Sequence, residues 1–135
     1  MHFVIDRAKW RCGAYGKHQH GIGPTYMLNT AGYMCCLGQI CQQLGCERSH
    51  LINCDGPANV ACRIHDGAAM NILLDKSKFQ NLFFTADGRI SGFTHTMMQI
   101  NDDSLLTDNR REDELKQVCI EYGHTIEFIG EFDKE

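Results

Sequence analysis

The sequence has no long run of apolar residues. Its longest runs are only a few residues, far shorter than the roughly 20 that a membrane-spanning helix needs. The first seven residues reach a charge at Asp6 and contain no apolar centre of the kind found in secretory signals. Positive charge is also scarce, since 13 Lys and Arg stand against 17 Asp and Glu. The net charge of -4 argues against duplex nucleic acid as the default partner. These features predict a cytoplasmic protein that does not enter a membrane.

The eight cysteines include no Cys-x-x-Cys pair. That absence removes the usual spacing signal of a zinc site or a redox pair. In a reducing cytosol we expect free thiols, most of them packed in the core as small apolar groups.

The 135 residues are enough for one domain. We expect a single α+β domain over residues 1–135. Alternating residues predict strands at 2–6 and 124–129, and a short strand is expected at 26–29. Helical spacing predicts helices at about 33–44 and before Gly123, the second capped by Thr107, Asp108 or Asn109. Residues 47–70 read as irregular, 71–84 have an ambiguous period, and 94–100 fit a strand or a short helix. Pairing of the terminal strands would give a small mixed or antiparallel sheet, packed against two or three helices.

Several segments resemble a group of small uncharacterised proteins from phages and bacterial genomes. The matching pieces are Phe3–Trp10, the Gly-Tyr-Met-Cys-Cys-Leu-Gly stretch at 32–38, Ile100-Asn-Asp-Asp103 and the helix–strand unit at 112–128. The resemblance implies a phage or prokaryotic origin, with the host cytoplasm as the location if a phage encodes the chain. It implies no established activity and transfers no catalytic residue.

The segment from Cys12 to Pro24 contains four glycines and one proline, which predicts a loop. Glycine-rich backbone can wrap an anion with its amide groups, and Arg11, Lys17, His18 and His20 supply basic side chains. The phosphate-loop signature is absent, because neither Ser nor Thr follows Lys17. We therefore predict a binding site for a partner or small anion at these four residues. Arg63, beside His65, is a second candidate position.

Two kinds of chemistry remain as alternatives. Cys35 or Cys36 opens a predicted helix, where the dipole could lower the thiol pKa, and His95 could act as the base of a papain-like or NlpC-type hydrolase. Against this, Met34 and Leu37 make the surroundings apolar, which raises a thiol pKa. Cys12, His18 and His20 lie close enough in sequence to contribute to a composite metal site. Asp102 and Asp103 precede the last helix and are expected to cap it rather than to bind a metal.

The sequence therefore favours a non-enzymatic phage-type accessory protein without a cofactor. It would bind a host protein or a small nucleotide-like anion, as a means of countering host defence. The alternative is the cysteine hydrolase using Cys36 or Cys35 with His95.

Overall fold

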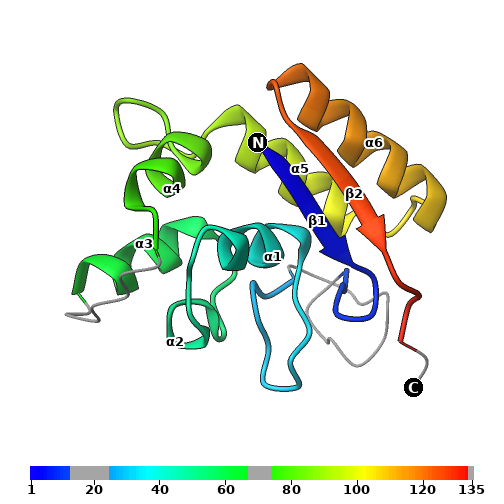
Figure 1. Ribbon diagram of the computed structural model, residues 1–135, viewed down its shortest axis with the longest axis horizontal. Coiled ribbons are helices and arrows are strands. Elements are labelled where there is room, and N and C mark those ends of the chain that lie inside the picture. Colours follow the sequence, from blue (N-terminus) through cyan, green and yellow to red (C-terminus); the bar gives the residue numbers. More distant parts are fainter. Residues whose placement is uncertain (13–24, 67–73, 134–135) are drawn as a thin grey trace.

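The computed structural model describes residues 1–12, 25–66 and 74–133 (Figure 1). Within these residues the fold is α+β, with two strands and six helices. The elements are β1 (His2–Asp6), α1 (Cys36–Gln43), α2 (Arg48–Leu51), α3 (Pro57–Asp66), α4 (Lys76–Phe83), α5 (Gly92–Asp102), α6 (Asp108–Glu121) and β2 (Thr125–Ile129). None of the described helices has both the length and the apolar character needed to cross a membrane.

The two terminal strands pair with each other, as the sequence predicts. The pairing is parallel, with His2 opposite Thr125 and Asp6 opposite Ile129, and so differs from the expected mixed or antiparallel sheet. Parallel strands need a long crossover connection, and here the whole middle of the chain forms it. In Figure 1 the strands run side by side in the same direction, with α6 on the side of β2 away from β1.

Helix α1 closes the other edge of β1 with two glutamine side chains. The Gln39 amide accepts a hydrogen bond from the Asp6 N–H at 2.8 Å and donates to the Asp6 carbonyl at 3.1 Å. The Gln43 amide makes the same pair of bonds with Val4, where it accepts from the N–H at 3.0 Å. The side chains of α1 thus replace the third strand that β1 would otherwise need.

The structure differs most from the prediction in segments whose sequence has no clear periodicity. The segment expected to be irregular contains α2 and α3, and the ambiguous 94–100 region is the middle of α5. Ser91 caps α5, and Thr107 caps α6 by accepting a hydrogen bond from the Arg110 N–H. The expected strand at 26–29 is reduced to a single bridge between Leu28 and Ile52.

The core lies between the sheet and helices α1, α5 and α6. Its largest members include Phe3, Trp10, Leu37 and Phe93. Seven of the eight cysteines are also buried, and only Cys62 is exposed, which confirms the expectation of core thiols. Packing is tight where α1 crosses the chain at Met27, since a Cβ at Gly38 would lie 1.9 Å from the Met27 carbonyl oxygen. Only glycine fits at that position.

Candidate functional site

The chain segments on either side of residues 13–24 meet at the carboxyl end of α5. Asn101, which is 1% exposed, donates from Nδ2 to the Arg11 carbonyl at 3.3 Å and to Thr25 Oγ1 at 3.3 Å. One buried side chain therefore holds the last residues before this segment and the first residue after it. We call the group of Trp10, Thr25, Cys36, Asn101 and Asp102 the polar junction.

The oxygen of the Asn101 side-chain amide binds two further segments of the chain. Its Oδ1 accepts from the Trp10 indole N–H at 2.7 Å and from the Cys36 backbone N–H at 3.0 Å. The second bond satisfies one of the N–H groups that have no partner within the first turn of a helix. The amide of Asn101 therefore ties the start of α1 to the Trp10 segment and to α5.

Asp102 completes the junction through Thr25. Its Oδ1 accepts from Thr25 Oγ1 at 2.5 Å and from Asn101 Nδ2 at 2.9 Å. Its Oδ2 accepts from the Thr25 N–H at 3.3 Å. The expectation that Asp102 and Asp103 cap the last helix is wrong, because Asp102 is the last residue of α5, Asp103 is its C-cap, and Thr107 caps α6. Asp102 instead uses its charge to hold Thr25.

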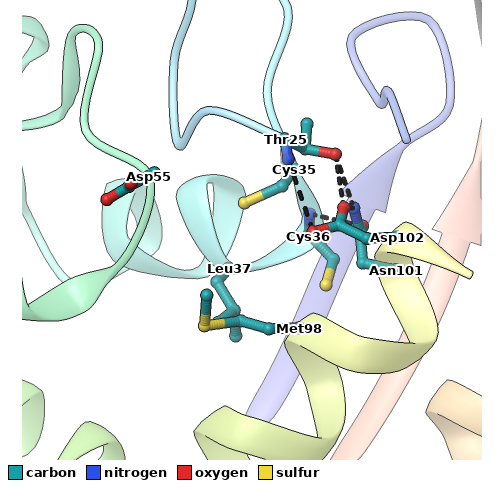
Figure 2. A pocket seen from close by; sticks show the side chains of 8 residues that line it. All are labelled: Thr25, Cys35, Cys36, Leu37, Asp55, Met98, Asn101 and Asp102. Carbon is teal, nitrogen blue, oxygen red and sulfur yellow. Dashed lines mark hydrogen bonds between the residues drawn. The ribbon is translucent and has the colours of Figure 1, made fainter. Parts of the chain in front are cut away.

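A small cavity lies beside the junction (Figure 2). It is lined by Thr25, Cys35, Cys36, Leu37, Asp55, Met98, Asn101 and Asp102. Its volume is about 10 Å³, roughly the room that one water molecule requires. A cavity of this size does not accommodate a substrate in this conformation.

The two adjacent thiols are buried at the start of α1. Cys35 is the N-cap residue, and its Sγ accepts from the Gly38 N–H at 3.4 Å. Burial nevertheless raises the pKa of the Cys35 thiol to about 12, outweighing the lowering effect of that hydrogen bond. Burial also raises the pKa of Cys36 well above its usual value. Both thiols are therefore protonated at neutral pH, the opposite of an activated nucleophile.

The candidate base lies away from these thiols. His95 is exposed, and its ring makes no hydrogen bond within the described part of the chain. It sits six residues before Asn101 on α5, which is about 9 Å along a helix axis. The geometry that a thiol–imidazole pair needs is thus not formed by Cys35 or Cys36 with His95.

The predicted basic residues have different surroundings from those expected. Arg11 is fully buried, with its guanidinium 3.6 Å from the centre of the Tyr33 ring and a bond of 2.8 Å to the Trp10 carbonyl. It therefore does not form part of an exposed basic surface. The Arg63 guanidinium donates to the carbonyls of Ser49 and Ile52 at the end of α2. Its role is to hold α2 against α3.

The remaining predicted loop residues, Lys17, His18 and His20, lie outside the described residues. The proposed metal ligand set also depends on two of them. Its third member, Cys12, is buried, and burial raises the pKa of its thiol to about 12. Among residues 1–12, 25–66 and 74–133, no group of three His, Cys, Asp or Glu side chains could hold a metal ion.

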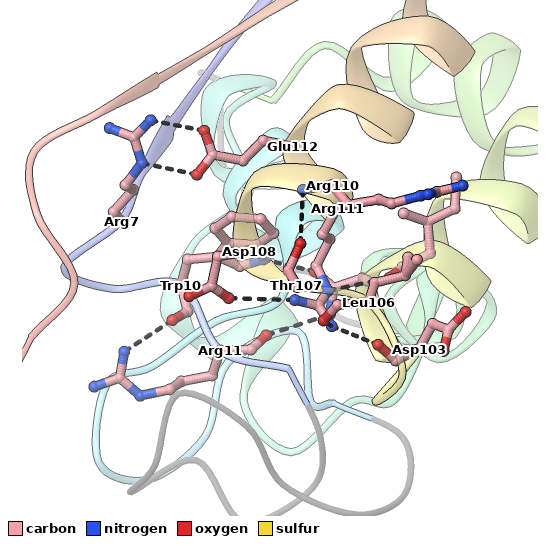
Figure 3. Close-up of polar contacts among 12 residues, drawn as sticks. Arg7, Trp10, Arg11, Asp103, Leu106, Thr107, Asp108, Arg110, Arg111 and Glu112 are labelled. Atoms are coloured by element: carbon pink, nitrogen blue, oxygen red, sulfur yellow. Dashed lines mark hydrogen bonds and ion pairs between the residues drawn. The ribbon is translucent and has the colours of Figure 1, made fainter.

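Sequence reasoning missed two buried polar residues that organise this region. Asn101 lies within the Ile100–Asp103 motif, which the resemblance singled out without indicating a role. Arg111 is fully buried and donates to the carbonyls of Ile100 at 3.3 Å and Leu106 at 3.2 Å, and also to that of Asp103. Figure 3 shows its side chain reaching into the turn between α5 and α6. No local pattern in the sequence distinguishes these residues from exposed ones.

Comparison with known proteins adds no further information on the site. No protein-family model matches the chain, and no curated protein or solved structure matches it either. The functional argument therefore rests on the residues themselves.

Proposed function

We propose that this is a non-enzymatic accessory protein that binds an anion-bearing partner through the segment between Arg11 and Thr25. The ligand is a nucleotide-like small molecule or an acidic surface of a host protein. The chemistry common to both is a phosphate or carboxylate group. Binding of a host component, as a phage protein would do to counter defence, is the biological setting that fits the resemblance.

The hydrogen bonds within the polar junction support this proposal. Asn101 gives all of its amide hydrogen-bonding capacity to Trp10, Cys36, Arg11, Thr25 and Asp102. A catalytic site leaves a polar group free to act on a substrate, whereas here the buried polar groups position the backbone. A binding segment benefits from fixed ends because less conformational entropy is then lost on binding.

Lys17 supplies a positive charge within that segment, and the two histidines supply ring N–H donors. Lys17, His18 and His20 lie in an otherwise acidic chain among several glycines, and glycine allows backbone amides to approach an anion closely.

The surroundings of Cys35, Cys36 and His95 disfavour the hydrolase alternative. Cys35 and Cys36 are buried, burial raises their pKa values, and His95 is exposed on α5. A hydrolase would require the start of α1 to open, and Asn101 and Leu37 both hold it in place.

The test has two stages. The protein is first captured on resin, exposed to a bacterial lysate, and the retained proteins and small molecules are identified by mass spectrometry. The identified ligand is then titrated against the Lys17→Ala/His20→Ala variant. Binding should be lost while the melting temperature stays within a few degrees, because surface substitutions usually change stability by less than about 0.5 kcal/mol.

A control variant removes at least as much charge elsewhere. Arg48 and Lys76 are exposed on α2 and α4, so Arg48→Ala/Lys76→Ala removes two positive charges without touching the junction. This variant should bind as the unmodified protein does. Unchanged binding by Lys17→Ala/His20→Ala would refute the proposed location.

A further inference from the structure

Two cysteines stand at the carboxyl end of α1, where the chain turns back on the helix. The Gly45 N–H donates to the Gln42 carbonyl at 3.0 Å. The Cys46 N–H donates to the Cys41 carbonyl, also at 3.0 Å. Gly45 has a φ of 101°, in the left-handed region that glycine adopts readily. These features define a Schellman motif, in which the side chains at the two ends of the longer bond commonly pack together.

The two ends of that bond are both cysteines, and we call Cys41 and Cys46 the thiol pair. Two Cα atoms that are joined through one backbone hydrogen bond lie roughly 5–6 Å apart, within the range of about 4.4–6.8 Å that a disulfide spans. A hydrogen bond with Cys41 lowers the pKa of the Cys46 thiol, although burial opposes it. Burial, together with the same bond, raises the pKa of Cys41 well above its usual value. The sulfur atoms are therefore neighbours, and joining them needs little movement of the backbone.

Other buried thiols are held by different groups. The Cys35 Sγ lies 3.6 Å from the Met27 Sδ, and the Cys54 Sγ donates to the His50 carbonyl at 3.4 Å. Neither a thioether nor a carbonyl can form a disulfide. Within the described residues, the thiol pair is thus the place where the fold brings one thiol against another in a geometry suited to a bond.

The members of the thiol pair differ in exposure. Cys41 is fully buried, whereas Cys46 is 5% exposed and is followed by the exposed Glu47. Cys46 is therefore the sulfur that a small reagent reaches first, and it is also the one with the lowered pKa. A more acidic thiol poised beside a second thiol that can resolve it is the arrangement of redox-sensitive cysteines.

We propose that Cys41 and Cys46 form a reversible disulfide when the protein meets a peroxide, and that this bond locks the carboxyl end of α1. The site lies outside the segment between Arg11 and Thr25, so either proposal can fail without the other.

The oxidation has two steps. The Cys46 thiolate attacks one oxygen of hydrogen peroxide, the O–O bond breaks, and Cys46 becomes a sulfenic acid. The departing hydroxide takes up the proton that the Cys46 thiol released. The Cys41 sulfur then attacks the Cys46 sulfur, the S–O bond breaks, and the Cys41 proton leaves with the hydroxyl group as water. In total the two thiols lose two hydrogen atoms and one peroxide becomes two waters, while exchange with a reducing thiol restores the pair.

The end of α1 connects three parts of the fold, which gives the bond a consequence. Gln43, in the last turn, accepts from the Val4 N–H at 3.0 Å on the edge of β1. The Leu44 carbonyl accepts from the N–H of Asp75, the N-cap of α4, at 2.9 Å. A disulfide across this turn holds both contacts in place and restricts the unfolded chain. Oxidation should therefore stabilise the sheet edge and the start of α4.

The first test locates the bond. Native full-length protein is treated with hydrogen peroxide, the remaining thiols are blocked under denaturing conditions, and chymotrypsin then cleaves after leucine. Cleavage separates segment 38–44, which contains Cys41, from segment 45–51, which contains Cys46. Mass spectrometry should find the two segments joined, and a reducing thiol should part them. Segments that stay separate after peroxide treatment, or a Cys46 joined to a different cysteine, would overturn the proposal.

A variant tests the order of the two steps. In Cys41→Ser the sulfenic acid at Cys46 has no thiol to resolve it, so dimedone, which reacts with sulfenic acids, should label Cys46 several-fold more than in the unmodified protein. Cys54→Ser replaces another buried thiol and should leave the joined segments and the weak labelling unchanged. Equal labelling of Cys46 in Cys41→Ser and Cys54→Ser would refute the role of Cys41.

Stability provides the second readout. Peroxide should raise the melting temperature of the unmodified protein and of Cys54→Ser by several degrees, and should slow hydrogen exchange at the Val4 amide. The shift should be absent in Cys41→Ser and also in Cys46→Ser, which alters the less buried member of the pair. An equal shift in either of these two variants would show that oxidation acts elsewhere and would overturn the proposal.

Discussion

Replacing Asn101 by alanine tests the polar junction most severely. The substitution leaves the Trp10 indole N–H and the Cys36 N–H without their acceptor. It also removes the donor to the Arg11 carbonyl. Each buried polar group left unsatisfied costs about 1–3 kcal/mol. Two donors left without an acceptor predict a decrease of about 2–6 kcal/mol in the free energy of unfolding, against a typical total of about 5–15 kcal/mol.

The assay is urea unfolding followed by the fluorescence of Trp10, the only tryptophan in the chain, with circular dichroism as an independent signal. For an m-value of about 1.5 kcal/mol/M, a loss of about 3 kcal/mol lowers the midpoint by about 2 M. Gln99→Ala on the exposed side of α5 is the control, and its midpoint should change little. A decrease below about 0.5 kcal/mol in Asn101→Ala, the usual limit for a surface substitution, would refute the structural role of the junction.

Three further predictions concern the thiols and the sheet. In native protein a thiol reagent should label the exposed Cys62 quickly and Cys35 and Cys36 only after unfolding; rapid native labelling of either buried thiol would contradict their packing. Because burial raises the folded-state pKa of Cys12 and Cys35 to about 12, from the ordinary value of 9.0, their contribution to stability should be complete below pH 9 and decrease as the pH rises from about 9 toward 12. Denaturation curves across that range should show the decrease, and Cys35→Ala should flatten it whereas Cys62→Ser should not. Deleting the last ten residues removes β2 from Ile126 onward, so circular dichroism should show an unfolded domain; a truncated chain that melts cooperatively at the original temperature would show that the sheet is dispensable.

The sequence predicts the elements whose periodicity is strong and locally determined. Both terminal strands and α6 are of this kind, since Ile126 alternates with exposed neighbours and Leu115, Val118 and Cys119 recur at helical spacing. Helix α1 was also expected, at about 33–44, but it begins at Cys36 after the N-cap Cys35 and ends at Gln43. Helix α2 was missed because it has only four residues. Helix α3 has ten, but tertiary contacts hold both helices, such as the hydrogen bond from Arg63 to the end of α2.

The site was harder to predict because burial of polar residues depends on distant partners. Arg11 was expected on a basic surface, but Tyr33 and the Trp10 carbonyl enclose it. Asn101 makes contacts with residues as distant in sequence as Trp10 and Arg11, and no local spacing encodes them. The parallel pairing of the strands was similarly hidden, since strand direction depends on the path of the whole intervening chain.

The central claim is that the segment between Arg11 and Thr25 binds an anion and that the buried thiols of Cys35 and Cys36 perform no chemistry. The most direct measurement is a calorimetric titration of inorganic pyrophosphate into the unmodified protein, into Cys35→Ala and into Lys17→Ala/His20→Ala, with the melting temperature of each recorded. We predict saturable binding to the first two proteins and none to the third, whose melting temperature stays within a few degrees of the original. Equal binding by Lys17→Ala/His20→Ala, or loss of binding in a folded Cys35→Ala variant, would contradict the claim.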